Sequence, residues 1–246
     1  MKNKDKINYI VEWMQKYTQN ADNKIQALVV GVSGGIDSAL TSTLCALTNI
    51  RTIVLCMPIK SNINKLGSEH CKWLVSNFSN VESIYVDLTK TFAAFESECL
   101  KNNVSSELGF ANSKARLRMT LLYQVASSNY GLVVGTGNKV EDFGIGFYTK
   151  YGDGGVDISP IADLNKTTVR ELSKELKISQ KIIDAPPTDG LWDDGRTDED
   201  QIGLTYEELE NAMIDENSIN RDKYIQIRRQ NLHKMNPIPI CKFDDD

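Results

Sequence analysis

The sequence lacks several patterns that would assign it to a common class of protein. Its five cysteines include no Cys-x-x-Cys pair and are spread along the chain, so neither a zinc site nor a disulfide framework is indicated. No apolar run approaches the length of a membrane span, and the lysine-rich N-terminus has no apolar signal core. These absences favour a cytoplasmic protein with reduced thiols and no membrane contact.

The sequence also lacks an excess of basic residues. The chain has 28 Lys and Arg against 33 Asp and Glu, a formal charge of −5, and a pI near 5.2, which argues against a general nucleic-acid surface. With 246 residues, 41% of them hydrophobic, the chain can bury one sizeable core. We therefore expect a single domain over residues 1–246 that acts on small molecules.

What the sequence does contain is a stretch rich in glycine and serine between a strand and a helix. Residues 27–30 are apolar and rich in β-branched residues, whereas apolar residues after Ser38 recur at helical spacing. The glycines allow backbone N–H groups to approach an anion, the serines add hydroxyls, and the helix N-terminus adds free N–H groups. The predicted phosphate-binding residues are Gly31, Val32, Ser33, Gly34, Gly35, Ile36, Asp37 and Ser38.

The alternative for this stretch is a capped helix after a glycine turn, a feature worth about 1 kcal/mol to the fold. Two serines, two glycines and an aspartate in six residues favour phosphate binding instead. The stretch lacks the Lys-Ser/Thr ending of a Walker loop, so it does not indicate γ-phosphate transfer. It resembles the Ser-Gly-Gly-x-Asp-Ser loop of the ATP pyrophosphatase superfamily, which implies ATP as a substrate and pyrophosphate as a product.

Strand-like apolar runs alternate with segments of helical period along the first half of the chain. Strands are expected at 27–30, 51–58, 81–86 and 131–136, with helices near the N-terminus and at 64–78, 89–100 and 112–128. This alternation predicts an α/β fold with a doubly wound parallel sheet. Its ligands should bind beyond the carboxyl ends of the strands.

Two later segments break the alternation. Residues 142–157 hold five glycines among aromatic residues, and residues 184–203 hold seven acids and two prolines. We expect mobile loops near 143–156 and 184–203 that close over a ligand. Residues 205–230 are expected to form short helices, followed by a polar tail.

Further motifs resemble the ammonia-dependent NAD synthetase family. They are Lys-Ala-Arg-Leu-Arg-Met at 114–119, Gly-Thr-Gly-Asn-Lys-Val-Glu at 135–141 and Thr-Lys-Tyr-Gly-Asp-Gly-Gly at 149–155, in order with Asn165-Lys166, Pro187-Thr188 and His233-Lys234. The resemblance implies an adenine-nucleotide α-hydrolase-like (Rossmann-like) fold. It also implies a homodimer that binds the dinucleotide near the subunit interface. The implied reaction converts nicotinic acid adenine dinucleotide (deamido-NAD), ATP and ammonia to NAD, AMP and pyrophosphate.

Two carboxylates are candidate metal ligands at the expected ligand-binding edge. Asp37 follows the first strand and Glu141 follows the strand expected at 131–136. Carboxylates and phosphate oxygens are the ligands that Mg²⁺ prefers, and the resemblance assigns both residues to the metal. The alternatives are a helix cap for Asp37 and a solvated helix position for Glu141.

The resemblance also implies that Thr136, Lys166 and Thr188 contact ATP. A lysine can neutralise charge that develops on phosphate, whereas threonine supplies only a hydroxyl. The alternative for Lys166 is an ordinary position on the protein surface.

A set of mainly basic residues matches the positions that bind deamido-NAD in this family. Cationic side chains suit the diphosphate and the nicotinate carboxylate of that ligand. Because Arg118 lies two positions after Arg116 on a helix, the two face different sides, and only Arg116 is assigned to the substrate. The implied residues are Arg116, Lys150, Asp157, His233 and Lys234.

The nitrogen donor is expected to be free ammonia. Asp153 is the candidate residue to orient or shield ammonia beside the acyl adenylate. Gly137 and Asn138 stand where many relatives have an Asp-His pair, so no ammonia role is assigned to these two side chains. The phosphate loop begins at Gly31 and a brief polar tail follows Lys234, so no glutamine amidase domain is expected.

Three other functions fit part of the pattern. An RNA-thiolating enzyme shares the phosphate loop but should carry catalytic or metal-binding cysteines and a basic surface, which this sequence lacks. A non-catalytic nucleotide-binding module of the stress-protein kind explains the loop but not Arg116, Glu141 or Lys150. Another AMP-forming amide ligase stays open, and AMP release that depends on deamido-NAD would distinguish it.

Overall fold

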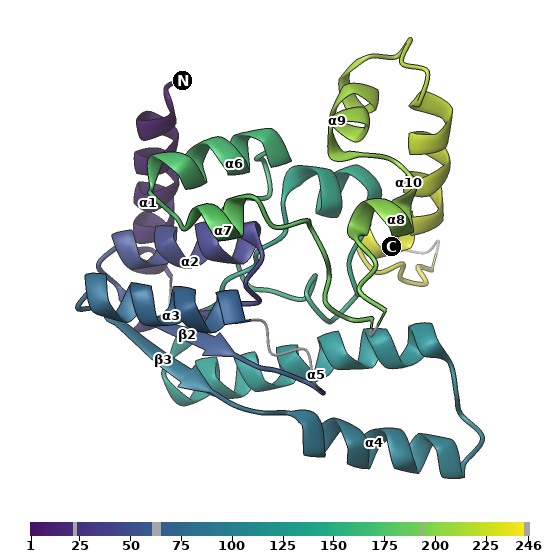
Figure 1. Ribbon diagram of the computed structural model, residues 1–246, viewed down its shortest axis with the longest axis horizontal. Helices are drawn as coiled ribbons and strands as arrows, with labels where there is room; N and C mark the ends of the chain where they lie inside the picture. The colour runs from purple at the N-terminus through teal and green to yellow at the C-terminus, as the bar shows by residue number, and fades with distance from the viewer. Residues whose placement is uncertain (22–23, 61–64, 193, 244–246) are drawn as a thin grey trace.

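The computed structural model describes residues 1–21, 24–60, 65–192 and 194–243. Four parallel strands form one sheet in the order β3-β2-β1-β4; Figure 1 labels β2 and β3 of this sheet. In chain order the elements are α1 (Asn3–Gln19), β1 (Ala27–Gly31), α2 (Ile36–Leu47), β2 (Arg51–Cys56), α3 (Lys65–Asn77), β3 (Val81–Tyr85), α4 (Thr89–Lys101), α5 (Glu107–Ser128), β4 (Gly131–Val133), the π-helix η1 (Lys139–Ile145), α6 (Lys166–Glu175), α7 (Gln180–Ile183), α8 (Asp198–Ile202), α9 (Tyr206–Ile214) and α10 (Arg221–Met235).

The central strand is apolar throughout because helices cover both faces of the sheet. Residues 27–30 of β1 are all buried, as expected for a parallel sheet. Leu28 and Val30 belong to the core on the side of α1, α2 and α6, whereas Ala27 and Val29 belong to the core formed with α5. Figure 1 shows α2 and α3 over one face and α5 on the other. The prediction of a doubly wound α/β sheet is therefore confirmed.

The strand order reverses beside β1. The chain runs outward from β1 through β2 to β3 and then returns to the opposite side of β1 to form β4. Ligands of open α/β sheets bind where the order reverses, outside the carboxyl ends of the strands. The segments that follow β1 and β4 meet at this point, and they carry the phosphate loop and η1.

Several element boundaries differ from the predictions. Helix α5 begins at Glu107 rather than near 112, because the Ser106 side chain accepts a hydrogen bond from the Gly109 N–H and caps the helix. Strand β4 ends at Val133, and Val134 continues only as a bridge to Ile158. The helix expected at 64–78 corresponds to α3, and its predicted first residue, 64, lies outside the described residues.

The C-terminal third forms its own packing unit against η1. Helix α10 has 15 residues, so the expectation of only short helices was wrong. Apolar residues of η1, α9 and α10 pack in one cluster, which includes Tyr206, 2% exposed, and Ile202 of α8. Figure 1 shows α8 beside α10. Parts of both expected loops are helical, since η1 reaches into 143–156 and α8 lies within 184–203; the mobility of these loops stays a prediction.

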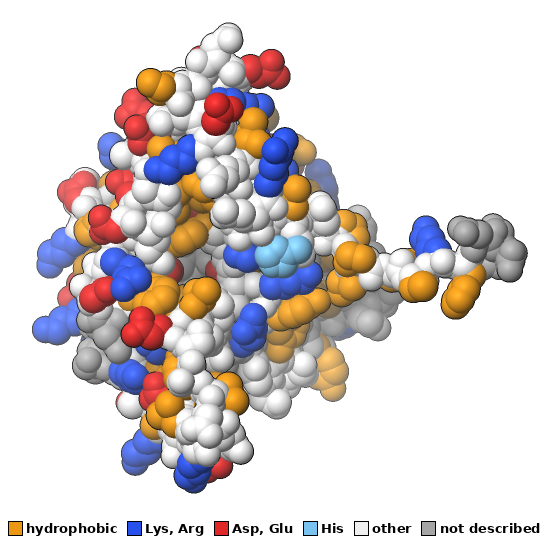
Figure 2. Space-filling model, turned by 90° about the vertical axis from the view of Figure 1, so that its right-hand side faces the viewer, with side chains coloured by type: hydrophobic (Ala, Val, Ile, Leu, Met, Phe, Trp, Pro, Cys, Tyr) orange, Lys and Arg blue, Asp and Glu red, His pale blue; other side chains and the backbone are white. Residues whose placement is uncertain are grey.

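The surface and the thiols are consistent with the composition. Acidic and basic side chains are interspersed over much of the face in Figure 2. All five cysteines are free thiols, and the sulfurs of Cys56 and Cys71 lie 3.1 Å apart although the sequence separates them. Among the described residues, no helix has the length and apolarity that a membrane crossing requires.

Candidate active site

The loop after β1 is a tight glycine turn that leads into α2. Gly34 has a φ of 92°, a conformation that glycine adopts at little cost. The Ser38 hydroxyl accepts a hydrogen bond from the Ser33 N–H at 3.2 Å and donates to the Gly35 carbonyl at 2.9 Å. Gly35 is the N-cap of α2 and caps it without a side chain. Asp37 is therefore not the helix cap; it lies in the first turn and is available for another contact.

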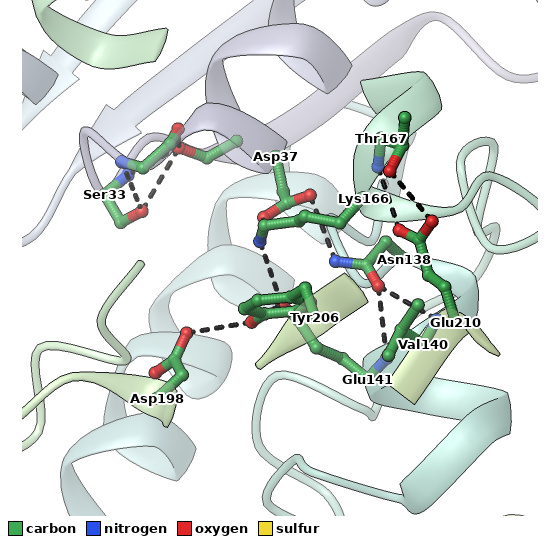
Figure 3. Close-up of polar contacts among 12 residues, drawn as sticks. Ser33, Asp37, Asn138, Val140, Glu141, Lys166, Thr167, Asp198, Tyr206 and Glu210 are labelled. Atoms are coloured by element: carbon green, nitrogen blue, oxygen red, sulfur yellow. Dashed lines mark hydrogen bonds and ion pairs between the residues drawn. The ribbon is translucent and has the colours of Figure 1, made fainter. Parts of the chain in front are cut away.

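Lys166 joins the two carboxylates that follow β1 and β4. Its Nζ lies 2.5 Å from Asp37 Oδ2 and 2.9 Å from Glu141 Oε1, as Figure 3 shows. The lysine side chain is 2% exposed and both carboxylates are 16% exposed. Lys166 is thus a buried cation rather than a surface residue, and Glu141 is not a solvated helix position.

The shared lysine sets the ionisation of the cluster. Burial lowers the pKa of Lys166, but the charges of Asp37 and Glu141 outweigh burial and raise that pKa. Burial acts to raise the pKa of Glu141, yet the Lys166 charge and the Tyr206 hydrogen bond hold it below its usual value. Burial, with the Glu141 charge, raises the pKa of Asp37 in spite of Lys166. One lysine therefore does not fully compensate two buried carboxylates.

Asn138 connects these carboxylates, a role that the sequence analysis missed. Its Nδ2 donates to Asp37 Oδ1 at 3.2 Å, and its Oδ1 accepts from the N–H groups of Val140 and Glu141. The side chain thereby caps η1 and fixes Glu141 relative to Asp37. An asparagine after a glycine and before a helical segment is an N-cap signal, but the sequence holds no signal for the contact with Asp37.

Tyr206 and Asp198 were also missed. The Tyr206 hydroxyl donates to Glu141 Oε1, and it lies 3.1 Å from Asp198 Oδ2. The Lys166 ammonium lies 4.5 Å from the centre of the Tyr206 ring. A Thr-x-x-Glu capping box at 205–208 marks the start of α9 in the sequence. Only the packing of α9 against η1 shows that Tyr206 reaches the site.

Gly137 provides the space for a third carboxylate. A Cβ at residue 137 would overlap the Asp142 carboxylate, so this carboxylate occupies the volume of the missing side chain. Burial and the charges of Glu141, Asp153 and Asp37 raise the pKa of Asp142 to about 8.

Two buried carboxylates that share one lysine are suitable ligands for a divalent cation. Asp37 and Glu141 are hard oxygen donors that share the single Lys166 ammonium. No three such side chains converge on a metal position by themselves in the part of the chain that the structure describes. Mg²⁺ commonly takes one or two carboxylates and completes its ligands with water and substrate phosphates. The residues present therefore fit Mg²⁺ that arrives with ATP.

We expect the Asp142→Asn variant to be more stable than the wild type at pH 8, by at least about 1 kcal/mol. In the unfolded chain this carboxyl is ionised above about pH 4, whereas the fold keeps it protonated up to about pH 8. The folded state thus binds more protons, and the free energy of unfolding falls as pH rises. Urea unfolding of the ligand-free protein at about pH 6.5 and 8 measures this slope.

Both pH values for the unfolding measurement are at or above about 6.5, because His70 affects the pH dependence of stability below that pH. Burial lowers the pKa of His70 to about 4, so below its ordinary value of about 6.5 this histidine makes stability rise with pH. Asp222→Asn removes an exposed charge on α10 and serves as the control. Equal slopes for wild type and Asp142→Asn would contradict the prediction.

The basic residues predicted to bind the acyl substrate lie together. Arg116 Nε donates to the Lys150 carbonyl at 3.2 Å, and Lys150 Nζ donates to the His233 carbonyl at 2.8 Å. Lys234 Nζ donates to two carbonyls of the loop after η1. Figure 2 shows lysine and arginine side chains around a histidine on this face. Arg118 turns away and donates to the Met57 carbonyl, which confirms that Arg116 and Arg118 face different sides.

The remaining candidates have structural contacts of their own. Asp157 accepts hydrogen bonds from the Val133 N–H at 2.7 Å and the Tyr123 hydroxyl at 3.0 Å. Asp153 is exposed, and its Oδ1 accepts from the Thr149 N–H at 3.0 Å. The Thr188 hydroxyl donates to the Arg196 carbonyl. Thr136 is partly buried just after the β4 segment.

The parallel sheet, with helices on both faces, has the adenine-nucleotide α-hydrolase-like fold, and the buried Lys166 cluster lies at the reversal of its strand order. The family model of NAD synthase matches residues 6–238. The chain belongs to this family, whose members are ligases, and the resemblance expected from its motifs is confirmed.

Individual relatives agree with this assignment. The NH(3)-dependent NAD(+) synthetase of Mesoplasma florum is 39% identical over 239 residues, which cover 96% of this chain and 93% of the relative. The solved NMN synthetase of Francisella tularensis has a TM-score of 0.88 at 29% identity and covers 99% of this chain and 100% of its own. The NH3-dependent NAD synthetase of Campylobacter jejuni has the same fold, with a TM-score of 0.77 at 24% identity over 98% of this chain and 100% of its own.

Proposed function

We propose that this chain is an ammonia-dependent NAD synthetase, which uses ATP to convert deamido-NAD to NAD with release of AMP and pyrophosphate. The observation that carries the proposal is the Lys166 ammonium between Asp37 and Glu141, next to the phosphate loop at the reversal of strand order. Relatives that are 35% to 40% identical bear the name NH(3)-dependent NAD(+) synthetase.

The first half-reaction joins the nicotinate carboxylate to the α-phosphorus of ATP. The N–H groups and hydroxyls of the loop after β1 would hold the β- and γ-phosphates. Lys166 would neutralise negative charge that builds on the departing pyrophosphate, because a positioned cation in a site with little water stabilises such charge strongly. Mg²⁺ held by Asp37, Glu141 and the phosphates would, when bound, supply further positive charge. Thr136 and Thr188 are the proposed hydroxyl contacts to ATP.

The second half-reaction replaces AMP by ammonia. Arg116, Lys150, His233 and Lys234 would hold the acyl substrate through its diphosphate and ring substituents, with Asp157 beside them. Asp153 would orient ammonia toward the acyl carbon, because its carboxylate can accept an N–H hydrogen bond from the incoming nitrogen.

The decisive experiment measures products with ammonium or glutamine as the sole nitrogen donor. Ammonium should give NAD, AMP and pyrophosphate in equal amounts, and glutamine freed of ammonia should give almost none. Cys45, Cys56 and Cys71 are buried, so they are poorly placed to act as an amidase nucleophile. Absence of NAD with ammonium, or comparable rates with the two donors, would overturn the proposal.

A second candidate is NMN synthesis from the corresponding deamido mononucleotide. It is favoured by the higher TM-score to the Francisella tularensis structure than to the Campylobacter jejuni structure, 0.88 against 0.77. Competition between equal concentrations of the deamido dinucleotide and mononucleotide distinguishes the two. We expect the larger kcat/KM for the dinucleotide; a larger value for the mononucleotide would establish the second candidate.

Arg116→Ala is expected to weaken deamido-NAD binding by about 10- to 100-fold, since a charge-assisted hydrogen bond contributes about 1.5 to 3 kcal/mol. ATP binding should change little, because Arg116 lies in the basic cluster rather than at the phosphate loop. Calorimetric titration with each ligand separately measures both effects. Arg170→Ala on α6 is the control, and an equal loss for both ligands would move Arg116 into a shared or structural role.

We also propose a homodimer in the cytoplasm. A cavity of about 650 Å³ lies on α5 and the nearby loop, and Met119, Tyr123 and Tyr151 are among its lining residues. Free thiols suit a reducing compartment. Light scattering that gives a monomer at working concentration would contradict the dimer.

A further inference from the structure

Asp198 is a buried carboxyl group that reaches the catalytic cluster through one tyrosine. It is the first residue of α8 and is 6% exposed. Its Oδ2 lies 3.1 Å from the Tyr206 hydroxyl, which in turn contacts Glu141 Oε1. Figure 3 shows the Asp198 carboxyl group directed at the Tyr206 hydroxyl. Among the described residues, Asp198 Oδ1 has no hydrogen-bond partner.

The number of protons in this chain of contacts is limited. A tyrosine hydroxyl has a single proton to donate. Glu141 Oε1 also faces the Lys166 ammonium at 2.9 Å, so Glu141 stays ionised. Its Oε1 therefore accepts the hydrogen bond that the Tyr206 hydroxyl donates. The contact between Asp198 and Tyr206 is then a hydrogen bond only if Asp198 carries a proton and donates it.

The surroundings of Asp198 favour the same protonation state. The charged and titratable groups that face it are Glu141 on η1, Lys166 on α6, Tyr206 on α9 and Asp189 in the loop before α8. The only cation among these four is already paired with Asp37 and Glu141. Burial and the Glu141 charge raise the pKa of Asp198 to about 7, and an ionised carboxylate with one buried unpaired oxygen would be costly.

We propose that Asp198 is a positioning residue that acts as a neutral acid: it donates a hydrogen bond to Tyr206, which holds the Glu141 carboxylate in place beside Lys166. The inference rests on the proposed function, because Glu141 matters through the ATP site. Asp198 also links the acidic segment 184–203 to that site. Its N–H donates to the carbonyl of Pro187, the residue before Thr188, at 3.0 Å.

The Asp198→Asn variant is the sharpest test, because an amide N–H can donate to Tyr206 as the protonated acid does. The probe is ATP–pyrophosphate exchange with deamido-NAD and without ammonia, so that ammonia protonation does not affect the pH profile. Asp198→Asn should retain at least about a third of the wild-type exchange rate. Asp198→Ala and Tyr206→Phe should each lose about tenfold or more at saturating ATP.

The pH profile of the exchange rate distinguishes a positioning role of Asp198 from a purely structural one, because a structural role would not change that profile. The wild-type exchange rate should decline above about pH 7 as Asp198 loses its proton, and Asp198→Asn should lack this decline. Asp222→Asn is the control for loss of an exposed charge. A rate for Asp198→Asn as low as that for Asp198→Ala would overturn the proposal, because it would mean that the ionised carboxylate is required. A wild-type rate for Asp198→Ala would overturn it equally.

A measurement without substrates separates this inference from the proposed function. The midpoint of thermal unfolding of the ligand-free wild type should fall more between about pH 6.5 and 8 than that of Asp198→Asn, since a carboxyl with a raised pKa loses stability as pH rises. Equal slopes would overturn the inference. A wild type without exchange activity would refute the proposed function alone, and the unfolding comparison would still decide the role of Asp198.

Discussion

Asp37→Asn is expected to lower kcat by about 100- to 1,000-fold, equivalent to about 2 to 4 kcal/mol of transition-state stabilisation. Asp37 is the residue that brings the phosphate loop and Lys166 together, with 2.5 Å between its Oδ2 and Nζ. Asparagine keeps the shape and the contact with Asn138 but removes the charge. The lysine would lose part of its orientation, and the proposed metal site would lose an anionic ligand.

The fold should survive this substitution. Asp37 lies in the first turn of α2, where the backbone of Gly35 caps the helix, and its side chain is not part of the apolar core. Steady-state kinetics at saturating Mg²⁺ and ATP, with circular dichroism as the check on folding, measures the effect. Asp163→Asn is the matched control, because its side chain is 93% exposed. Activity near that of the wild type would show that the Asp37 charge is not used.

Lys166→Met should lower the free energy of unfolding by about 3 to 5 kcal/mol at pH 8, because it leaves two buried carboxylates without their cation. The lysine is 2% exposed and contacts both of them. In the variant, the pKa values of Asp37 and Glu141 should rise, so the folded state would bind more protons than the unfolded chain. The loss of stability should therefore shrink as the pH falls toward 5.

A double variant isolates the charge effect from the loss of packing. Lys166→Met with Asp37→Asn removes one of the two unpaired charges and should recover part of the stability that Lys166→Met alone loses. Urea unfolding at pH 8 and at about pH 5 is the measurement. A Lys166→Met protein as stable as the wild type at pH 8 would mean that the ion pairs are not formed in solution. The single variant should also lose most synthetic activity, since Lys166 is the proposed cation at the leaving phosphate.

Much of the fold could be predicted because parallel sheets place strong local patterns in the sequence. Strand β1 is apolar at every buried position, since helices cover both of its faces. The turn between β1 and α2 depends on local backbone geometry, so the glycines and serines at 31–38 mark it directly. Helix starts were less predictable: the Ser106 cap moved the start of α5, and no signal distinguished α10 from shorter helices.

The roles of the side chains around the loop were less accessible from the sequence. The motifs identified Asp37, Glu141 and Lys166 separately, but they did not predict that one buried lysine would lie between the two carboxylates. Asn138 was set aside, and Tyr206 and Asp198 were not considered, because they come from segments with only capping signals. The place of Asp142 in the space beside Gly137 depends on a π-helical turn, which no periodicity predicted.

The sequence by itself determined the parallel sheet, the glycine turn after β1 and the family, since each depends on residues that are close together along the chain or on an ordered set of motifs. Tertiary structure alone decided the electrostatics of the site. Asp37, Glu141, Lys166 and Tyr206 come from four separate elements, and their distances depend on how these elements pack. Burial and mutual charge at those distances then determine which groups are ionised, and no single segment of the chain contains that information.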